Sequence, residues 1–151
     1  MGKRYIRRKE QAAMNLPECY QEDIFFFFNE KPKELALYQA LEQAVEKRLP
    51  QAEVRVQKSQ ISFYGKYLFA AASLPVRRRK GCPEQCLVVT VGLPCKVDSP
   101  RVVVAVEPYP GRWTHHILIT CPEEVDSQLM EWVEEAWNFA QTKGGGRRKR
   151  G

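Results

Sequence analysis

Polar side chains cluster in two segments of the chain that otherwise consist of strand-forming residues. The first segment, V-Q-K-S-Q-I-S-F, runs from Val56 to Phe63, and the second, P-Y-P-G-R-W-T-H-H-I, runs from Pro108 to Ile117. Sequence positions that break a local structural pattern are often functional positions. Neither segment matches a common catalytic signature. The two segments therefore indicate where a site would lie without indicating a reaction.

The polar residues of these segments and of the S-P-R motif before residue 102 form a candidate anion site. Its members are Lys58, Ser59, Gln60, Arg101, Arg112, and one of His115 and His116. Guanidinium groups suit bidentate recognition of a carboxylate or a phosphate. The sequence therefore favours a small, non-catalytic binding module for an anionic small molecule or peptide. In the alternative, these residues cap turns and pair with acidic neighbours, and no site exists.

His115 and His116 are the two histidines of the chain. Adjacent residues of a strand point to opposite faces of its sheet, so at most one histidine can face a given pocket. A metal site that uses both is not expected. We expect one histidine to be a buried, hydrogen-bonded core residue, and the other is a candidate proton carrier or anion contact.

The sequence lacks the signatures of the common enzyme classes. It contains no P-loop, glycine-rich dinucleotide turn, G-x-S-x-G or H-E-x-x-H motif. The five cysteines, with Cys82, Cys86 and Cys95 loosely spaced, fit thiols better than a zinc site or a finished disulfide framework. No metal or cofactor is therefore expected. An enzyme of unrecognised class that uses a histidine for acid–base work remains an alternative.

The net charge of +6 is located at the two ends of the chain. Residues 1–10 and 144–151 each carry +4, which leaves −2 for residues 11–143. Solvated tails explain such segments, but basic tails also bind nucleic acid through its phosphates. A second alternative is therefore a nucleic-acid-associated accessory protein. Its binding residues would be Arg77, Arg78, Arg79, Lys80, Arg147, Arg148, Lys149 and Arg150.

The elements that position these residues are expected to form one domain over residues 24–143. A disordered basic tail (1–23) precedes this domain and a flexible basic tail (144–151) follows it. Apolar residues at helical spacing predict two long helices, over about residues 31–48 and about residues 122–143. Five or six short strands between the helices predict a mainly antiparallel sheet. The expected class is α+β.

Two strand regions carry particular expectations. Val54 and Val56 are apolar on one parity, whereas Ile61 and Phe63 are apolar on the other. One strand cannot keep a face buried through that change, so a bend, bulge or tight turn is predicted within residues 57–60. Residues 101–107 fit a strand or a short helix, and their valines favour the strand. A loop is expected over residues 92–100.

No apolar run approaches the roughly 18–20 residues that a membrane span needs, and no apolar segment of a secretory signal follows the basic N-terminus. With an odd number of cysteines, this favours a reducing cytoplasm and no membrane partner.

The order of the motifs resembles a known family. The motifs are L-Y-Q-A-L in the first predicted helix, E-V-R-V-Q-K-S-Q-I-S-F, S-P-R, E-P-Y-P-G-R-W-T-H-H-I, and the paired tryptophans of the last helix. Over about residues 25–141 they are similar to a family of bacterial domains of unknown function, numbered 5655. The resemblance implies a small α/β domain of the YdhG type and no established activity. Some domains of that type have been compared with frataxin-like iron chaperones, which use an acidic surface.

Overall fold

The structure, a computed structural model, describes residues 15–75 and 85–150, with side chains described as far as Thr142. The helices are α2 (Tyr20–Phe27), α3 (Pro32–Arg48) and α4 (Ser127–Arg150), and a short 3-10 turn, η1 (Pro122–Glu124), precedes α4. The strands are β1 (Glu53–Val56), β2 (Ile61–Tyr64), β3 (Leu68–Ser73), β4 (Leu87–Leu93), β5 (Val102–Tyr109) and β6 (Arg112–Ile119). The α+β class is confirmed, as is the strand that follows Arg101.

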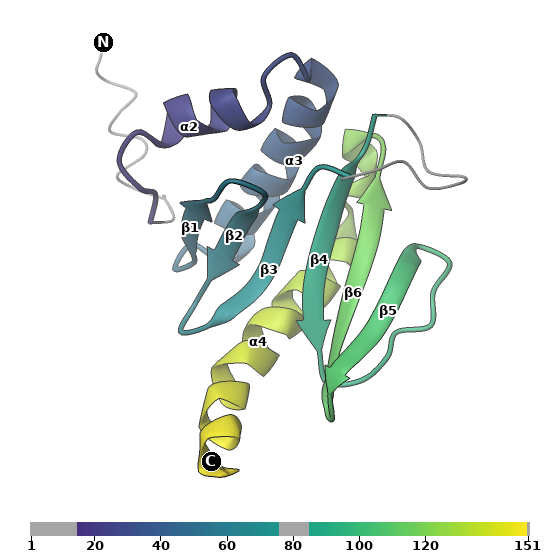
Figure 1. Cartoon of the computed structure of the whole chain (residues 1–151). Helices are drawn as coiled ribbons and strands as arrows, with labels where there is room; N and C mark the ends of the chain where they lie inside the picture. Colours follow the sequence, from purple (N-terminus) through teal and green to yellow (C-terminus); the bar gives the residue numbers. More distant parts are fainter. Residues whose placement is uncertain (1–14, 76–84, 151) are drawn as a thin grey trace.

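All six strands form one antiparallel sheet in the order β1-β2-β3-β4-β6-β5. Figure 1 shows α3 and α4 on the same side of this sheet. We call the other side, to which Ser62, Thr90 and His116 belong, the open face, because no helix of the described residues covers it. No helix within residues 15–75 and 85–150 is long and apolar enough to cross a membrane.

A third helix, α2, was not predicted, and its first four residues, Tyr20–Asp23, fall in the segment (1–23) that was expected to be a disordered tail. Tyr20, Ile24 and Phe28 follow one another at intervals of four residues and are all buried, which is helical spacing. The Tyr20 hydroxyl lies 2.6 Å from the Tyr38 hydroxyl and donates to Glu42 Oε2 at 2.8 Å, which joins α2 to α3. The run of four phenylalanines hides this periodicity, because it places apolar residues on every side of the helix.

The last helix differs from its predicted bounds at both ends. Residues Pro122–Glu124 form the separate turn η1, and α4 begins at Ser127. The Asp126 carboxylate accepts the Leu129 N–H at 3.0 Å, as an N-cap residue does. At its other end α4 continues to Arg150, through residues that were expected to belong to the flexible basic tail (144–151).

Aromatic contacts hold the two long helices against the covered face of the sheet. Tyr38 of α3 stacks on Phe63 of β2 with ring centroids 6.4 Å apart, and Trp137 of α4 meets Phe69 edge-on at 5.1 Å. The register shifts at this point, so that Phe69 is an extra residue between the Phe63–Ala70 and Tyr64–Leu68 pairs. This bulge brings Phe69 to within 6.4 Å of Phe63, beneath α4.

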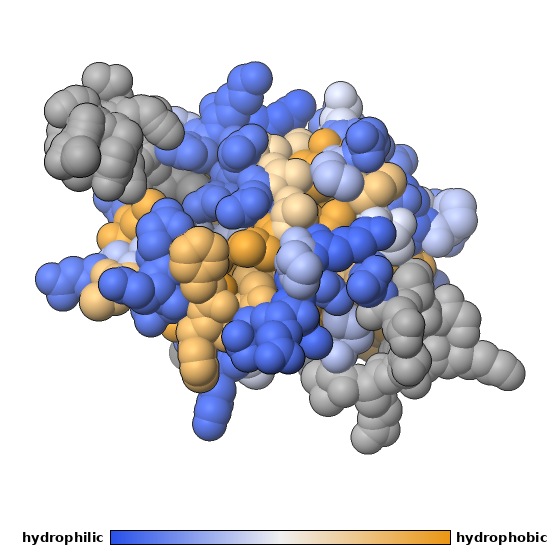
Figure 2. Space-filling view, turned by 90° about the horizontal axis from the view of Figure 1, so that it is seen from above, coloured by the Kyte–Doolittle hydropathy of each residue, from blue (hydrophilic) through white to orange (hydrophobic). Residues whose placement is uncertain are grey.

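The surface of the described residues carries few large apolar side chains. Seen from above, hydrophilic residues cover most of the visible surface and hydrophobic ones appear in patches between them (Figure 2). Five large apolar side chains are exposed among the described residues: Phe25, Phe26, Val103, Val106 and Tyr109. Two of these belong to α2 and three belong to β5.

Gly65, in the turn between β2 and β3, lies beneath Trp137. A methyl group at Gly65 would lie 2.6 Å from the Trp137 ring. Gly65→Ala is therefore expected to lower the free energy of unfolding by about 1–3 kcal/mol through overpacking, as measured by urea denaturation. In a Trp137→Leu background the same substitution should cost less. An equal cost in both backgrounds would contradict this packing.

Candidate functional site

Strand β6 carries Arg112 and both histidines, and its two faces have different surroundings. His115 pairs with Val91 of β4, whereas His116 pairs with Thr90. Because paired residues of neighbouring strands share a face, His115 lies on the helix-covered face and His116 lies on the open face. Arg112 lies four residues before His116 on β6, so its side chain is also on the open face.

His115 is a fully buried core residue. Its Nε2 accepts the Val97 N–H at 2.9 Å, so the proton of the neutral ring is on Nδ1, which has no partner among the described residues. Burial lowers the pKa of His115 below its usual value, against opposing contacts with the backbone of Val91 and Trp113. His115 therefore holds the β4–β5 connection on the helix-covered face of the sheet.

His116 and Arg112 are the predicted residues that share the open face. His116 Nδ1 lies 2.9 Å from the Thr90 hydroxyl. The guanidinium of Arg112 lies over Gly92, since a Cβ at Gly92 would be 2.5 Å from Arg112 Cζ. The Arg112 side chain is half-buried, and its guanidinium forms no hydrogen bond or ion pair within the part of the chain that the structure describes.

Small side chains form the part of the open face that lies between Ser62 and Thr114. The strand pairing places them in adjacent rows: Ser62 opposite Ala71, Ala71 opposite Thr90, and Gly92 opposite Thr114. At the far side Arg55 is engaged, because it lies 3.9 Å from the centroid of the Tyr64 ring and bonds to Glu53 at 3.0 Å. Arg112, in contrast to Arg55, has no partner among the described residues.

The sequence did not predict Thr90, Gly92 or Thr114 as site residues, and it placed Gly92 in a loop. In the structure Gly92 is buried within β4. A glycine inside a strand often marks a close approach by another group, and here that group is Arg112. In the sequence, Thr90 and Gly92 alternate with Val89, Val91 and Leu93. This alternation could have indicated that the strand continues through Gly92 with one polar face.

The first polar segment of the sequence forms a hairpin turn. The Gln57 N–H donates to the Gln60 carbonyl at 2.8 Å, and Lys58 and Ser59 are exposed at the tip. Gln60 Nε2 donates to the Ser62 hydroxyl at 2.8 Å, and this hydroxyl donates to Gln57 Oε1 at 2.5 Å. The predicted tight turn is confirmed, and its polar side chains close over a buried serine.

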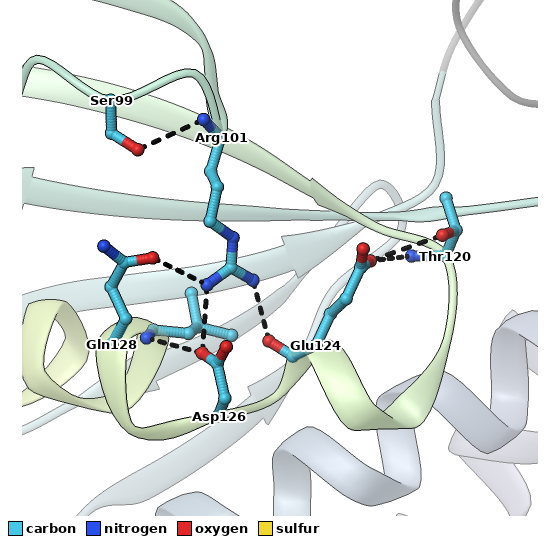
Figure 3. Close-up of polar contacts among 7 residues, drawn as sticks. Ser99, Arg101, Thr120, Glu124, Asp126 and Gln128 are labelled. Carbon is cyan, nitrogen blue, oxygen red and sulfur yellow. Dashed lines mark hydrogen bonds and ion pairs between the residues drawn. The ribbon is translucent and has the colours of Figure 1, made fainter.

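Arg101 joins the start of β5 to the start of α4 (Figure 3). Its Nη1 donates to Asp126 Oδ1 at 2.9 Å and to Gln128 Oε1 at 3.1 Å, and its Nη2 donates to the Glu124 carbonyl at 2.8 Å. The Glu124 carboxylate also accepts the Thr120 N–H at 2.7 Å. The donors of Arg101 are therefore used to fix two elements together.

Lys58, Arg101 and Arg112 do not converge on one site, contrary to the sequence-based hypothesis. Lys58 lies beyond the Ile61 end of β2, three strands away from Arg112 and at the opposite end of the sheet. The strand geometry separates them by roughly 20 Å. Arg101 is bound to α4. The residues that the structure does bring together on the open face are Arg112, Thr114, His116, Thr90 and Gly92.

The proposed nucleic-acid residues Arg77, Arg78, Arg79 and Lys80 lie outside the described residues, as does Cys82. Residues 147–150 belong to α4, but their side chains are not described, so this alternative stays a prediction. Cys86 is buried and Cys95 is exposed. Within the described ranges no three His, Cys, Asp or Glu side chains are arranged to hold a metal ion.

A family model described as "Domain of unknown function (DUF5655)" matches residues 26–140. The match spans most of the chain, including α3, all six strands and Arg112. It confirms the resemblance to family 5655. No curated protein and no solved structure matches the chain.

The Arg101 cluster is expected to contribute stability and not binding. Arg101→Gln should lower the free energy of unfolding by about 1–2 kcal/mol, because solvent weakens the interactions of this partly exposed cluster. Urea denaturation measures the loss, and a double-mutant cycle with Asp126→Asn should show coupling between the two residues. An unchanged unfolding midpoint in Arg101→Gln would contradict the anchoring role.

The lowered pKa of the Asp126 carboxyl gives the same cluster a pH dependence. Burial raises this pKa, but the Leu129 N–H and Arg101 outweigh that effect and lower it below the usual value. The unfolded chain therefore binds a proton at a higher pH than the folded chain does. The stabilisation that the ionised Asp126 carboxylate provides is complete above its pKa in the unfolded chain, about 3.9. It is lost as the pH falls through its pKa in the folded chain.

Stability is also expected to depend on pH through His115. Because its folded pKa is lowered, the unfolded chain takes up a proton first as the pH falls below about 6.5. Stability should decrease from there toward the folded pKa, by at most about 1.4 kcal/mol per pH unit from this residue. Urea denaturation from about pH 7.5 to 5 measures the slope.

His115→Gln should flatten this slope, whereas His116→Gln, on the open face, should retain it. A slope that persists in His115→Gln and disappears in His116→Gln would mean that the buried histidine is not the residue responsible.

Proposed function

We propose that the chain, which belongs to the DUF5655 family, is a small binding module that holds an anionic ligand on the open face of its sheet. The observation that carries this proposal is the position of Arg112. Its guanidinium is half-buried over Gly92 and has no partner among the described residues. A partly desolvated cation without a counter-charge is stabilised by an anion, and a guanidinium binds carboxylate or phosphate oxygens in a bidentate geometry.

The residues next to Arg112 supply further hydrogen-bonding groups. Thr114 follows Arg112 on the same face, and His116 follows Thr114. Side chains at alternate positions of a strand are about 7 Å apart, so a ligand of a few ångströms reaches from the guanidinium to the threonine hydroxyl. Gly92 adds no side chain, which leaves room for the ligand and for the guanidinium above the sheet.

The arrangement supports binding rather than catalysis. His115, buried on the covered face, has Nε2 engaged by the Val97 N–H. His116 lies beside Thr90 at 2.9 Å, in a pair that orients its ring. General acid–base work needs a group within hydrogen-bond reach of a reacting atom, and nucleophilic catalysis needs a nucleophile beside a base. Arg112 and Thr114 supply neither a base nor an activated nucleophile.

Inorganic phosphate is expected to raise the midpoint of thermal unfolding of the full chain, because a ligand that binds only the folded state stabilises it by mass action. At a phosphate concentration of about 100 times the Kd the stabilisation is about 2.7 kcal/mol. Chloride at equal ionic strength controls for charge screening.

Arg112→Gln should remove the phosphate-specific shift, and Gly92→Ala should reduce it, since the added methyl group displaces the guanidinium. Lys58→Gln removes the same charge from the β1–β2 hairpin, and phosphate should still raise the midpoint of thermal unfolding of this variant. The proposal fails if Arg112→Gln responds to phosphate as the unaltered chain does. It also fails if deletion of residues 144–151, and not Arg112→Gln, removes the response.

A further inference from the structure

Strand β5 places apolar side chains beside the polar row of β6 on the open face. The pairing joins Tyr109 to Arg112, Val106 to Thr114 and Val104 to His116. Paired residues share a face, so an apolar row and a polar row run side by side. Adjacent strands are about 4.8 Å apart, so one small molecule can contact both rows.

The apolar row is accessible. Val106 is 49% exposed and Tyr109 is 42% exposed, and both are among the few large apolar side chains that are exposed within the described residues. Isolated apolar residues on a surface are ordinary. These two differ because they adjoin the half-buried guanidinium of Arg112, so that the surface offers an apolar contact and a positive charge together.

We infer that the ligand is an amphipathic anion: a carboxylate or phosphate group bonded to an aromatic or aliphatic group, which lies on Val106 and Tyr109. This inference rests on the proposed function and adds the apolar half of the ligand. Charge complementarity places the anionic group at Arg112. Because neighbouring strands are close together, the apolar group of the ligand must begin within a few ångströms of its anionic group.

The irregular edge of β5 favours a small molecule over another strand as the occupant. The β5–β6 register shifts between Val102 and Val104 and again between Val106 and Tyr109. Pro108, which has no N–H to donate, lies within the second irregular stretch. Bulges and proline blunt an edge against pairing with a further strand. On the open face, Val106 and Tyr109 of this edge strand present exposed apolar surface.

The β5–β6 hairpin fixes the relative position of the two rows. Gly111 has a φ of +83°, a conformation that glycine adopts without strain, and its N–H donates to Glu107 Oε2 at 3.1 Å. This turn sets Tyr109 directly opposite Arg112. Glu107, the one charged residue of β5, is engaged within the turn, so its carboxylate stabilises the hairpin.

The experiment compares phenyl phosphate with inorganic phosphate on the full chain, by titration calorimetry or by ¹H–¹⁵N NMR where binding is weak. Phenyl phosphate is expected to bind at least about tenfold more tightly, because its ring buries apolar surface on β5. In Val106→Ser and Tyr109→Ser the ratio of the two affinities should fall toward one. Phe26→Ser removes an apolar side chain that is 83% exposed on α2, and it should leave the ratio unchanged.

The outcomes separate this inference from the function on which it rests. Equal affinities for the two phosphates, both lost in Arg112→Gln, would overturn the amphipathic ligand and leave the anion site standing. A preference for phenyl phosphate that survives in the Val106→Ser, Tyr109→Ser double variant would also overturn it. Binding of neither phosphate in an Arg112-dependent manner would overturn both. Circular dichroism of each variant verifies that the fold is retained.

Discussion

The helices of this protein cover one face of its sheet, and the other features depend on that constraint. Side chains alternate along a strand, so each strand sends one set of residues into the core and the other to the open face. His115 and His116 show the consequence most directly. One ring is buried and accepts the Val97 N–H, whereas its neighbour lies beside Thr90 on the open face. The same alternation keeps Arg112 out of the core.

The covered face provides the rigidity on which a site on the open face depends. Tyr38, Phe63, Phe69 and Trp137 form a continuous series of ring contacts from α3 through the sheet to α4. Arg101 fixes the entry to β5 onto the beginning of α4. At the β1 edge, Asn15 exchanges backbone hydrogen bonds of 3.0 Å with Ala52 and Val54. The open face is thus the surface of a sheet whose core side and one edge are already engaged.

The sequence predicted the features that depend on local patterns. The helix over Pro32–Arg48, the turn between Val56 and Ile61, and the strand after Arg101 follow from periodicity and propensity. The helix α2 was missed because its four-residue spacing is masked by the phenylalanine run. Arg112 and His116 of the site were predicted, but Thr90 and Gly92 were not, because they join the site through pairing between strands that are distant in the sequence. Arg101 meets Asp126, 25 residues away, whereas Lys58 and Arg112 lie at opposite ends of the sheet.

The central claim is that the two faces of β6 have separate roles, with anion binding confined to the open face. The most direct measurement is a ¹H–¹⁵N NMR titration of the full chain with inorganic phosphate, observing the arginine side-chain Nε–H signals and the backbone amides. The account predicts that the Arg112 Nε–H and the amides around Gly92 and Thr114 shift, while the Arg101 Nε–H does not. Shifts concentrated at Lys58, at Arg101 or in the basic ends of the chain would contradict it.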